Sequence, residues 1–254
     1  MKNSYAAIIP TYDRPDHLYN AIQSVKSQTL KPKEIIVVDN HPNSKNLNLV
    51  KNISKKLKIK INYLKYTGEG KALAARNYAS KKTNCKYIAF LDDDDEWKKS
   101  YAKEAINEIR KNKSKVCITE YNVINENRKK IFRFNIPKIL KIKDLYIWNP
   151  GVLCSNIIFE TRVFNNLNGY DSSILGSADK EILIRCIKNN IKYIVLQKPL
   201  VNWLRHKNQW SNNSKLILKG VVRFHKKYLP NMDLITKVRH YKKIIYYFFL
   251  SRIY

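Results

Sequence analysis

The chain has 254 residues, and its 49 lysines and arginines outnumber its 20 aspartates and glutamates to give a formal net charge of +29. A hydrophobic fraction of 44% is enough for a sizeable core and excludes an intrinsically disordered chain. The sequence contains no run of the ~18 apolar residues that a membrane span requires, and its N-terminus becomes polar too soon for a secretory signal, so we expect a cytoplasmic protein. The charge favours nucleic acid, an anionic membrane or a polyphosphate substrate as a partner, although a coding bias toward lysine would also produce it.

The first hundred residues alternate short apolar runs with amphipathic stretches, which is typical of βαβ units and a parallel sheet. A right-handed winding of such units places the fourth strand beside the first, on the side away from the second and third. The loops that follow the first, second and fourth strands then open onto one crevice at the carboxyl ends of the strands. The pattern predicts strands at 6–9, 34–39, 59–64 and 87–91, and helices at 15–28 and 70–81.

The rest of the chain has weaker periodicity. We predict that the basic, irregular segment 125–151 is a mobile loop over the crevice, and that the last forty residues are helical. The expected fold class is α/β, with a Rossmann-like, mainly parallel sheet flanked by helices and a C-terminal helical tail. The four cysteines form no C-x-x-C pair and have no histidine at zinc-ligand spacing, which predicts free buried thiols in a reducing compartment. Further predicted elements are helices at 101–110 and 179–189 and strands at 115–119, 154–160 and 191–196.

Four consecutive aspartates, 92–95, directly follow the predicted strand at 87–91. Adjacent carboxylates repel one another and lose hydration at the edge of a sheet, so a cation is expected to offset the cost. They form two overlapping D-x-D pairs, Asp92 with Asp94 and Asp93 with Asp95, which suit Mg²⁺ or Mn²⁺ bound to a diphosphate. The alternative is an acidic N-terminus of the next helix, which explains one or two of these aspartates but not four.

Several segments together resemble the family 2 glycosyltransferases with the GT-A fold, over most of residues 4 to 210. The resemblance implies transfer of a sugar from a nucleotide-diphosphate donor, such as a UDP- or dTDP-sugar, to an acceptor hydroxyl, with inversion at the anomeric carbon and Mn²⁺ or Mg²⁺ at the D-x-D. The acceptor would be a glycan or a lipid-linked glycan of surface polysaccharide or lipopolysaccharide synthesis. The segments that carry the resemblance are AAIIPTYDRPDHLYNAIQSVKSQT, EIIVVDN, GKALAARNYA, YIAFLDDDDEW and NGYDSSILGSADKEILIRC.

The resemblance also assigns roles to single residues. Tyr12 would stack on the nucleobase, and Asp39 or Asn40 would accept the N3–H of the base; Asn40 stands where the family commonly has a second acid. Arg76 would approach the diphosphate or lie on a helix surface. The expected donor-nucleotide contacts are Pro10, Tyr12, Arg14, Asp39, Asn40, Arg76, Asp92 and Asp93.

The resemblance also assigns the metal ligands and the general base. Asp94 would be the metal ligand, with Asp92 and His206 as further candidates. Asp179, near the start of a late helix, matches the family's general base, although the usual preceding acid is replaced by Ala178. The alternatives are a helix cap for Asp179 and an ordinary surface histidine for His206.

We expect a GT-A domain at 1–212, with a nucleotide-binding half at about 1–97 and an acceptor half at about 98–212. The basic and aromatic tail at 213–254 would either lie in a membrane interface or pack as an ordinary helix. Two other functions are compatible with the sequence. One is a basic nucleic-acid-binding protein, for which no binding motif is visible, and the other is an inactive family member that binds a nucleotide-sugar as a scaffold.

Overall fold

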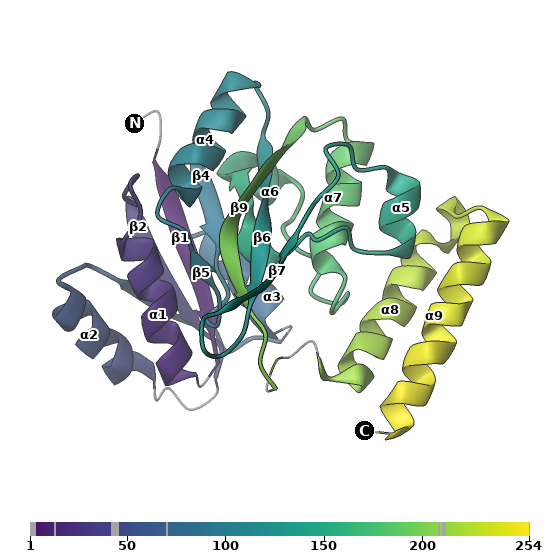
Figure 1. The fold of residues 1–254 in the computed structure, drawn as a ribbon, viewed down its shortest axis with the longest axis horizontal. Helices are drawn as coiled ribbons and strands as arrows, with labels where there is room; N and C mark the ends of the chain where they lie inside the picture. The colour runs from purple at the N-terminus through teal and green to yellow at the C-terminus, as the bar shows by residue number, and fades with distance from the viewer. Residues whose placement is uncertain are drawn as a thin grey trace.

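The computed structural model describes residues 4–12, 14–41, 46–69, 71–207, 209 and 212–253. A central sheet has helices on both faces, and a pair of long C-terminal helices lies at the end of the molecule opposite the second helix (Figure 1). The predicted α/β fold class is therefore confirmed.

The first half of the chain forms a parallel sheet. β1 pairs in parallel with β2 on one side and with β4 on the other, and β2 pairs in parallel with β3. This confirms the predicted strand order around the first strand, because β4 lies on the side away from β2 and β3. The helix α2 was not predicted, and β3 begins three positions later than expected. The elements are β1 (Tyr5–Thr11), α1 (Pro15–Lys26), β2 (Glu34–Asp39), α2 (Asn46–Leu57), β3 (Asn62–Lys65), α3 (Lys71–Ser80) and β4 (Tyr87–Phe90).

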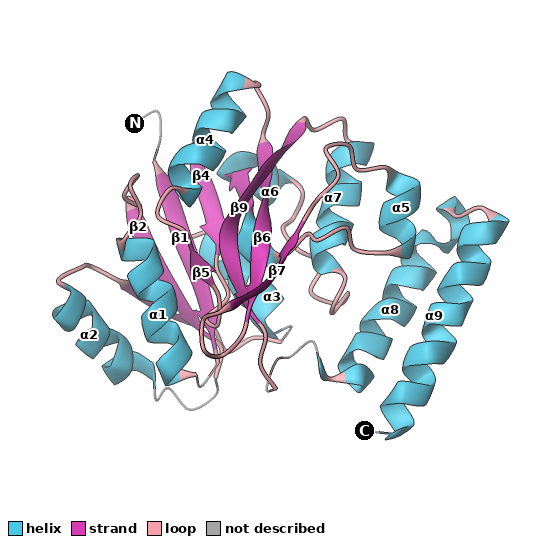
Figure 2. Cartoon of the chain, viewed as in Figure 1, coloured by secondary structure: helices cyan, strands magenta, loops and turns pink. Residues whose placement is uncertain are grey.

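The second half extends the same sheet with mixed pairing, so that within the described residues nine strands form one sheet in the order β3-β2-β1-β4-β8-β6-β9-β5, with β7 beside β6. β8 pairs antiparallel with both β4 and β6, whereas β6 and β9 are parallel. Figure 2 shows these strands running as one continuous layer. The elements are β5 (Glu96–Trp97), α4 (Tyr101–Lys111), β6 (Val116–Ile124), β7 (Lys130–Phe134), α5 (Ile142–Ile147), the 3-10 turn η1 (Cys154–Asn156), β8 (Ile157–Glu160), α6 (Thr161–Asn166), α7 (Ala178–Lys188), β9 (Tyr193–Leu204), α8 (Ser214–Tyr228), the 3-10 turn η3 (Leu229–Asn231) and α9 (Leu234–Ile253).

The prediction of a mobile loop at 125–151 is wrong. This segment forms the edge strand β7, which pairs antiparallel with β6, and the helix α5, which packs against α7 and α9. Four of the five residues of β7 are exposed, so the strand lacks the buried alternation that sequence patterns detect. α5 has only six residues, of which Leu145 and Tyr146 are buried. An edge strand and a helix this short give little periodic signal, although both are ordered by long-range packing.

Two apolar cores lie on opposite faces of the sheet, because successive side chains of a strand point to opposite sides. On one face, Ala6 and Ile8 of β1 pack with side chains of α3, α6 and α7. On the other face, Ala7 and Ile9 pack with side chains of α1, α2 and α4. All four of these β1 residues are fully buried. The result is a three-layer α/β/α arrangement in which the carboxyl ends of β1, β2 and β4 are left uncovered by helices.

The C-terminal helices α8 and α9 pack against each other and against this frame (Figure 1). Phe224 and Tyr228 of α8 belong to the core that contains α7. Gly220 lies so close to the preceding turn that an added Cβ would be 1.7 Å from the carbonyl oxygen of Leu175. α8 is therefore fixed to the residues just before α7. None of the helices in the described part of the chain is both long and apolar enough to cross a membrane.

Candidate active site

A cavity of about 570 Å³ opens at the carboxyl ends of β1, β2 and β4. Its other wall is formed by η1, by the turn before α7 and by the start of α7 itself. Two of the predicted site residues, Asp39 and His206, do not line the cavity. The predicted site residues that line it are Pro10, Tyr12, Arg14, Asn40, Arg76, Asp92, Asp93, Asp94 and Asp179.

The acidic cluster forms a tight turn after β4, closed by the hydrogen bond from the Asp95 N–H to the Asp92 carbonyl oxygen at 3.1 Å. Arginine side chains hold three of its carboxylates, and Arg14 contacts Asp93 at 3.4 Å as well as Asp94. The guanidinium of Arg76, which is buried, pairs with Asp92. Arg14 pairs with Asp94 at 2.6 Å, and the Nε2 atom of His206 lies 3.0 Å from the same Asp94 oxygen. These contacts offset the repulsion between neighbouring carboxylates.

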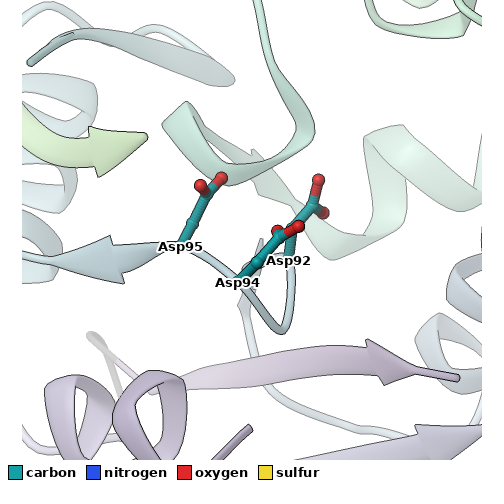
Figure 3. Close-up of side chains that lie close together, drawn as sticks. All are labelled: Asp92, Asp94 and Asp95. Atoms are coloured by element: carbon teal, nitrogen blue, oxygen red, sulfur yellow. The ribbon is translucent and has the colours of Figure 1, made fainter. Parts of the chain in front are cut away.

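The donor atoms of the cluster suit a hard divalent cation. One carboxylate oxygen from each of Asp92, Asp94 and Asp95 can lie within 4.8 Å of the others, and Figure 3 shows the three side chains on the same side of the turn. Burial, together with the carboxylates of Asp94 and Asp92, raises the pKa of Asp95 well above its usual range. The Oδ2 atom of Asp95 has no hydrogen-bond partner in the part of the chain that the structure describes. A bound cation would satisfy this oxygen and favour its charged form.

Asp93 points away from this group and toward β1. Its carboxylate accepts hydrogen bonds from the Thr11 hydroxyl at 2.9 Å and from the Tyr12 N–H at 3.4 Å. Burial and the neighbouring Asp94 carboxylate raise the pKa of Asp93 to about 7. The two overlapping D-x-D pairs are thus not equivalent, because Asp92 and Asp94 lie together whereas Asp93 and Asp95 are separated by their partners.

The two candidates for base recognition, Asp39 and Asn40, differ in what their side chains already bind. The carboxylate of Asp39 is fully buried and accepts hydrogen bonds from the His41 N–H at 2.8 Å and from the Tyr63 hydroxyl at 2.5 Å. Asn40 lines the cavity, and its buried Oδ1 has no hydrogen-bond partner among the described residues. Of the two, only Asn40 thus presents an acceptor oxygen to the cavity, whereas the Asp39 carboxylate is buried outside it.

Tyr12 and Trp203 present aromatic faces at the cavity. Tyr12 is 52% exposed and meets His41 edge-on, with 4.7 Å between the ring centroids. Trp203 lines the cavity. Trp148 is 44% exposed and does not line it. Tyr12 is free to stack on a planar ring, as Trp203 is to contact a sugar face.

Asp179 faces the cavity from the first turn of α7. Its Oδ1 atom accepts a hydrogen bond from the Cys154 thiol, with Sγ at 2.8 Å. Burial raises the pKa of Asp179 to about 6; the Asp92 carboxylate adds to this, and the Cys154 hydrogen bond and the Arg76 charge oppose it. A carboxylate with such a pKa is ionised at neutral pH and is still basic enough to accept a proton.

Comparison with known families shows the family of the chain that forms this cavity. The model of the glycosyl transferase family 2 matches residues 6–167, which include β1, the acidic cluster and η1. The chain belongs to glycosyltransferase family 2. The matched residues end before Asp179, so the family match by itself says nothing of the candidate base.

Relatives of this family 2 member are known in several bacteria. The poly(ribitol-phosphate) beta-N-acetylglucosaminyltransferase TarP of Staphylococcus aureus is 28% identical over 197 residues, which are 76% of this chain and 53% of TarP. An uncharacterized glycosyltransferase of Rickettsia felis is 32% identical over 196 residues, 70% of this chain and 32% of that protein. The aligned part of the chain therefore spans about half of TarP and a third of the Rickettsia protein.

Solved structures agree on the fold. The crystal structure of S. aureus TarS residues 1–349 in complex with UDP-GlcNAc superposes with a TM-score of 0.67, covering 97% of this chain and 72% of that one at 19% sequence identity. A likeness at this identity extends to the fold and confirms the expected GT-A architecture.

Sequence reasoning missed two residues of the site in this family 2 member. Cys154 contacts the candidate base, and the hydroxyl of Ser155 accepts a hydrogen bond from the Asp92 N–H at 3.0 Å. Asp95 was considered only in the second D-x-D, and the structure groups its carboxylate with those of Asp92 and Asp94. Cys154 and Ser155 were read as the beginning of a strand, and nothing in their spacing indicates contacts with residues 25 and 63 positions away.

Proposed function

We propose that the protein is an inverting glycosyltransferase that moves a sugar from a nucleotide-diphosphate donor to an acceptor hydroxyl. The observation that carries this proposal is the single cavity lined by both the acidic cluster and Asp179. One wall offers carboxylates for a metal-diphosphate complex, and the other offers a base of raised pKa. A direct displacement with inversion needs these two functions on opposite sides of the reacting carbon.

The proposed metal ligands are Asp92, Asp94 and Asp95, with His206 beside Asp94. A bound Mn²⁺ or Mg²⁺ would stabilise the negative charge of the leaving diphosphate. Arg14 and Arg76 already pair with carboxylates of this cluster and line the same cavity. Their guanidinium groups are in reach to bind diphosphate oxygens in a bidentate manner when the donor enters.

The proposed base is Asp179. Its ionised carboxylate would accept the proton of the acceptor hydroxyl as the oxygen attacks the anomeric carbon, because a neutral hydroxyl is a weak nucleophile. The low dielectric of the cavity strengthens the hydrogen bond between the acceptor hydroxyl and the Asp179 carboxylate. The protonated Asp179 then returns its proton to solvent after the product leaves.

Uracil is the proposed base of the donor. The free Oδ1 of Asn40 can accept the N3–H of uracil or thymine, and Tyr12 is exposed for stacking on the ring. The TarS structure with a similar fold contains UDP-GlcNAc, and a protein of Escherichia coli that is 39% identical over 92 residues, 35% of each chain, is a UDP-Glc:alpha-D-GlcNAc-diphosphoundecaprenol beta-1,3-glucosyltransferase, WfaP. By analogy with TarP and WfaP, we propose a surface glycan or a lipid-linked glycan as the acceptor.

A donor panel tests the function. The protein would be incubated with UDP-, dTDP-, GDP- and ADP-sugars in Mn²⁺ or EDTA at moderate salt, and the release of nucleoside diphosphate would be measured. We expect release from uridine donors in Mn²⁺ only. Nucleotide binding without turnover by any donor and acceptor would indicate the inactive scaffold. Salt-sensitive binding to random DNA in EDTA, with no preference among nucleotides, would support the nucleic-acid-binding alternative.

We further propose that α9 holds the enzyme on the anionic cytoplasmic face of a membrane. An apolar stripe on α9 is open to solvent, with exposed fractions of 76% for Leu234, 66% for Ile235 and 60% for Phe249. The 40 residues of 214–253 contain ten lysines and arginines and a single acid, Asp233. An apolar stripe flanked by positive charge suits insertion into the headgroup region of an anionic bilayer.

Vesicle flotation tests the membrane contact. The double substitution of Ile245→Ser with Phe249→Ser, on the exposed stripe of α9, is expected to abolish flotation with vesicles that contain phosphatidylglycerol. The control is Ile131→Ser with Phe132→Ser on β7, which removes a similar apolar area elsewhere and should leave flotation unchanged. Equal flotation of both variants would show that α9 is not the anchor. Self-association of the wild type without lipid would show that the apolar stripe binds a second copy of the chain.

A further inference from the structure

The candidate base Asp179 is in contact with the thiol of Cys154. Cys154, in the turn η1, lines the cavity and is 6% exposed. Its sulfur lies 2.8 Å from Oδ1 of Asp179. Burial raises the pKa of the Cys154 thiol well above its usual range, with the Asp179 and Asp92 carboxylates adding to the effect and Arg76 opposing it. The thiol therefore stays protonated throughout the pH range in which Asp179 titrates, and it is the hydrogen donor of the pair.

We infer that Cys154 is a positioning residue for the transfer reaction: its S–H···Oδ1 hydrogen bond fixes the orientation of the Asp179 carboxylate and leaves Oδ2 to take the proton of the acceptor. This inference rests on the proposed function of Asp179. A carboxylate on an α-helix otherwise rotates between several orientations, and only a fixed one presents a basic oxygen to a bound hydroxyl at all times.

The turn that carries Cys154 is itself firmly held. The Ser155 carbonyl oxygen accepts a hydrogen bond from the Trp97 indole at 2.8 Å, and the Ser155 hydroxyl accepts one from the Asp92 N–H. The Asn156 amide donates to the carbonyl oxygens of Thr119 at 2.7 Å and Gly151 at 2.9 Å. Two adjacent residues of one rigid turn thus contact both carboxylate regions, Cys154 the base and Ser155 the acidic cluster. η1 consequently sets the distance between the metal-binding loop and the base.

The chemistry of a thiol suits this role. The charged and titratable groups that face Asp179 are Arg76 on α3, Asp92 after β4, Cys154 on η1 and Tyr170 before α7. A neutral S–H is a weak donor, so it orients the carboxylate and withdraws little of its basicity. A cation in direct contact would lower the pKa of Asp179 much more and weaken it as a base.

The test compares Cys154→Ala and Cys154→Ser with wild type in kcat and KM as functions of pH. Loss of the donor in Cys154→Ala should move the acid limb of kcat to higher pH and lower the rate below pH 6 by about threefold to tenfold, since one pKa unit is a tenfold change in ionised fraction. Cys154→Ser, which keeps a donor, should bring the limb back to the wild-type position or below it, with KM unchanged. The control is Cys186→Ala, a fully buried cysteine on the core face of α7, which should leave the limb in place.

A second readout does not depend on turnover. The pKa of Asp179 would be followed by NMR of ¹³C-carboxyl aspartate at constant Mg²⁺, with its signal assigned by its absence in Asp179→Asn. The same order of midpoints, serine lowest and alanine highest, is expected. Equal midpoints in wild type and both Cys154 variants would overturn the inference whatever the activity. Shifted NMR midpoints with an unshifted pH–rate profile would show that the hydrogen bond exists but that Asp179 is not the base. Both the inference about Cys154 and the proposed function of Asp179 would then fail. Cys154→Ser keeps the test available if the alanine variant does not fold.

Discussion

The acidic cluster after β4 and the carboxylate of Asp179 face the same cavity but are held in opposite ways. Arginines hold the cluster, since Arg76 pairs with Asp92 and Arg14 pairs with Asp93 and Asp94, and the His206 ring lies beside Asp94. Asp179 makes no ion pair within the described residues and is held by a neutral thiol. The first arrangement groups several carboxylates with positive partners and suits cation and diphosphate binding, whereas the second isolates one carboxylate whose raised pKa suits proton transfer.

Removing the charge of Asp179 should have the largest effect on catalysis. We expect Asp179→Asn to lower kcat by about 10²–10⁴-fold, the usual contribution of general base catalysis, while nucleotide affinity stays unchanged. The measurement is steady-state kinetics together with calorimetric nucleotide titration. Asp171→Asn is the matched control, because Asp171 lies in the turn before α7 but pairs with Lys227, and it should have little effect. Full activity of Asp179→Asn would exclude Asp179 as the base.

The same substitution should also change stability in a pH-dependent way. The folded-state pKa of Asp179, about 6, lies above its ordinary value of 3.8, so ionising this group costs the folded protein free energy. The cost is absent below about pH 4, grows between pH 4 and 6 and is complete above that range. Asp179→Asn should therefore raise the free energy of unfolding at pH 7–8 and leave it unchanged near pH 4, as measured by urea unfolding. A destabilised variant at pH 8 would contradict the raised pKa.

The pH dependence of wild-type activity should give a smaller effect. Since the base must be ionised, kcat should be half of its plateau near pH 6 and about a tenth of it near pH 5. A rate that is constant between pH 5 and 8 would place the titrating group elsewhere.

The sequence predicted the wall of the cavity at the carboxyl ends of the strands better than the opposite wall. The residues after β1, β2 and β4 were placed correctly around one crevice because parallel strands bring their carboxyl ends to a common edge. This rule needs only the order of the strands, which apolar runs reveal. It could not show that Asn40 lines the cavity while Asp39 is buried and bonded to Tyr63, 24 residues away.

The second half of the fold follows no such rule. β8 enters the sheet antiparallel between β4 and β6, and η1 sits just before it. The roles of Cys154 and Ser155 depend on this placement, and a three-residue turn has no periodicity to reveal it. Asp179 was found only through its resemblance to a family motif, and its raised pKa, a property of burial, became visible only in the folded chain.

The central claim is that one cavity holds a metal-dependent diphosphate site and a separate base. Calorimetric titration of UDP in Mn²⁺ and then in EDTA, for wild type, Asp94→Asn and Asp179→Asn, tests it most directly. The account predicts Mn²⁺-dependent binding in the wild type, its loss in Asp94→Asn and its retention in Asp179→Asn, which should be bound but inactive. Binding that is independent of metal, or that survives in Asp94→Asn, would contradict the account and leave the four aspartates with a structural role.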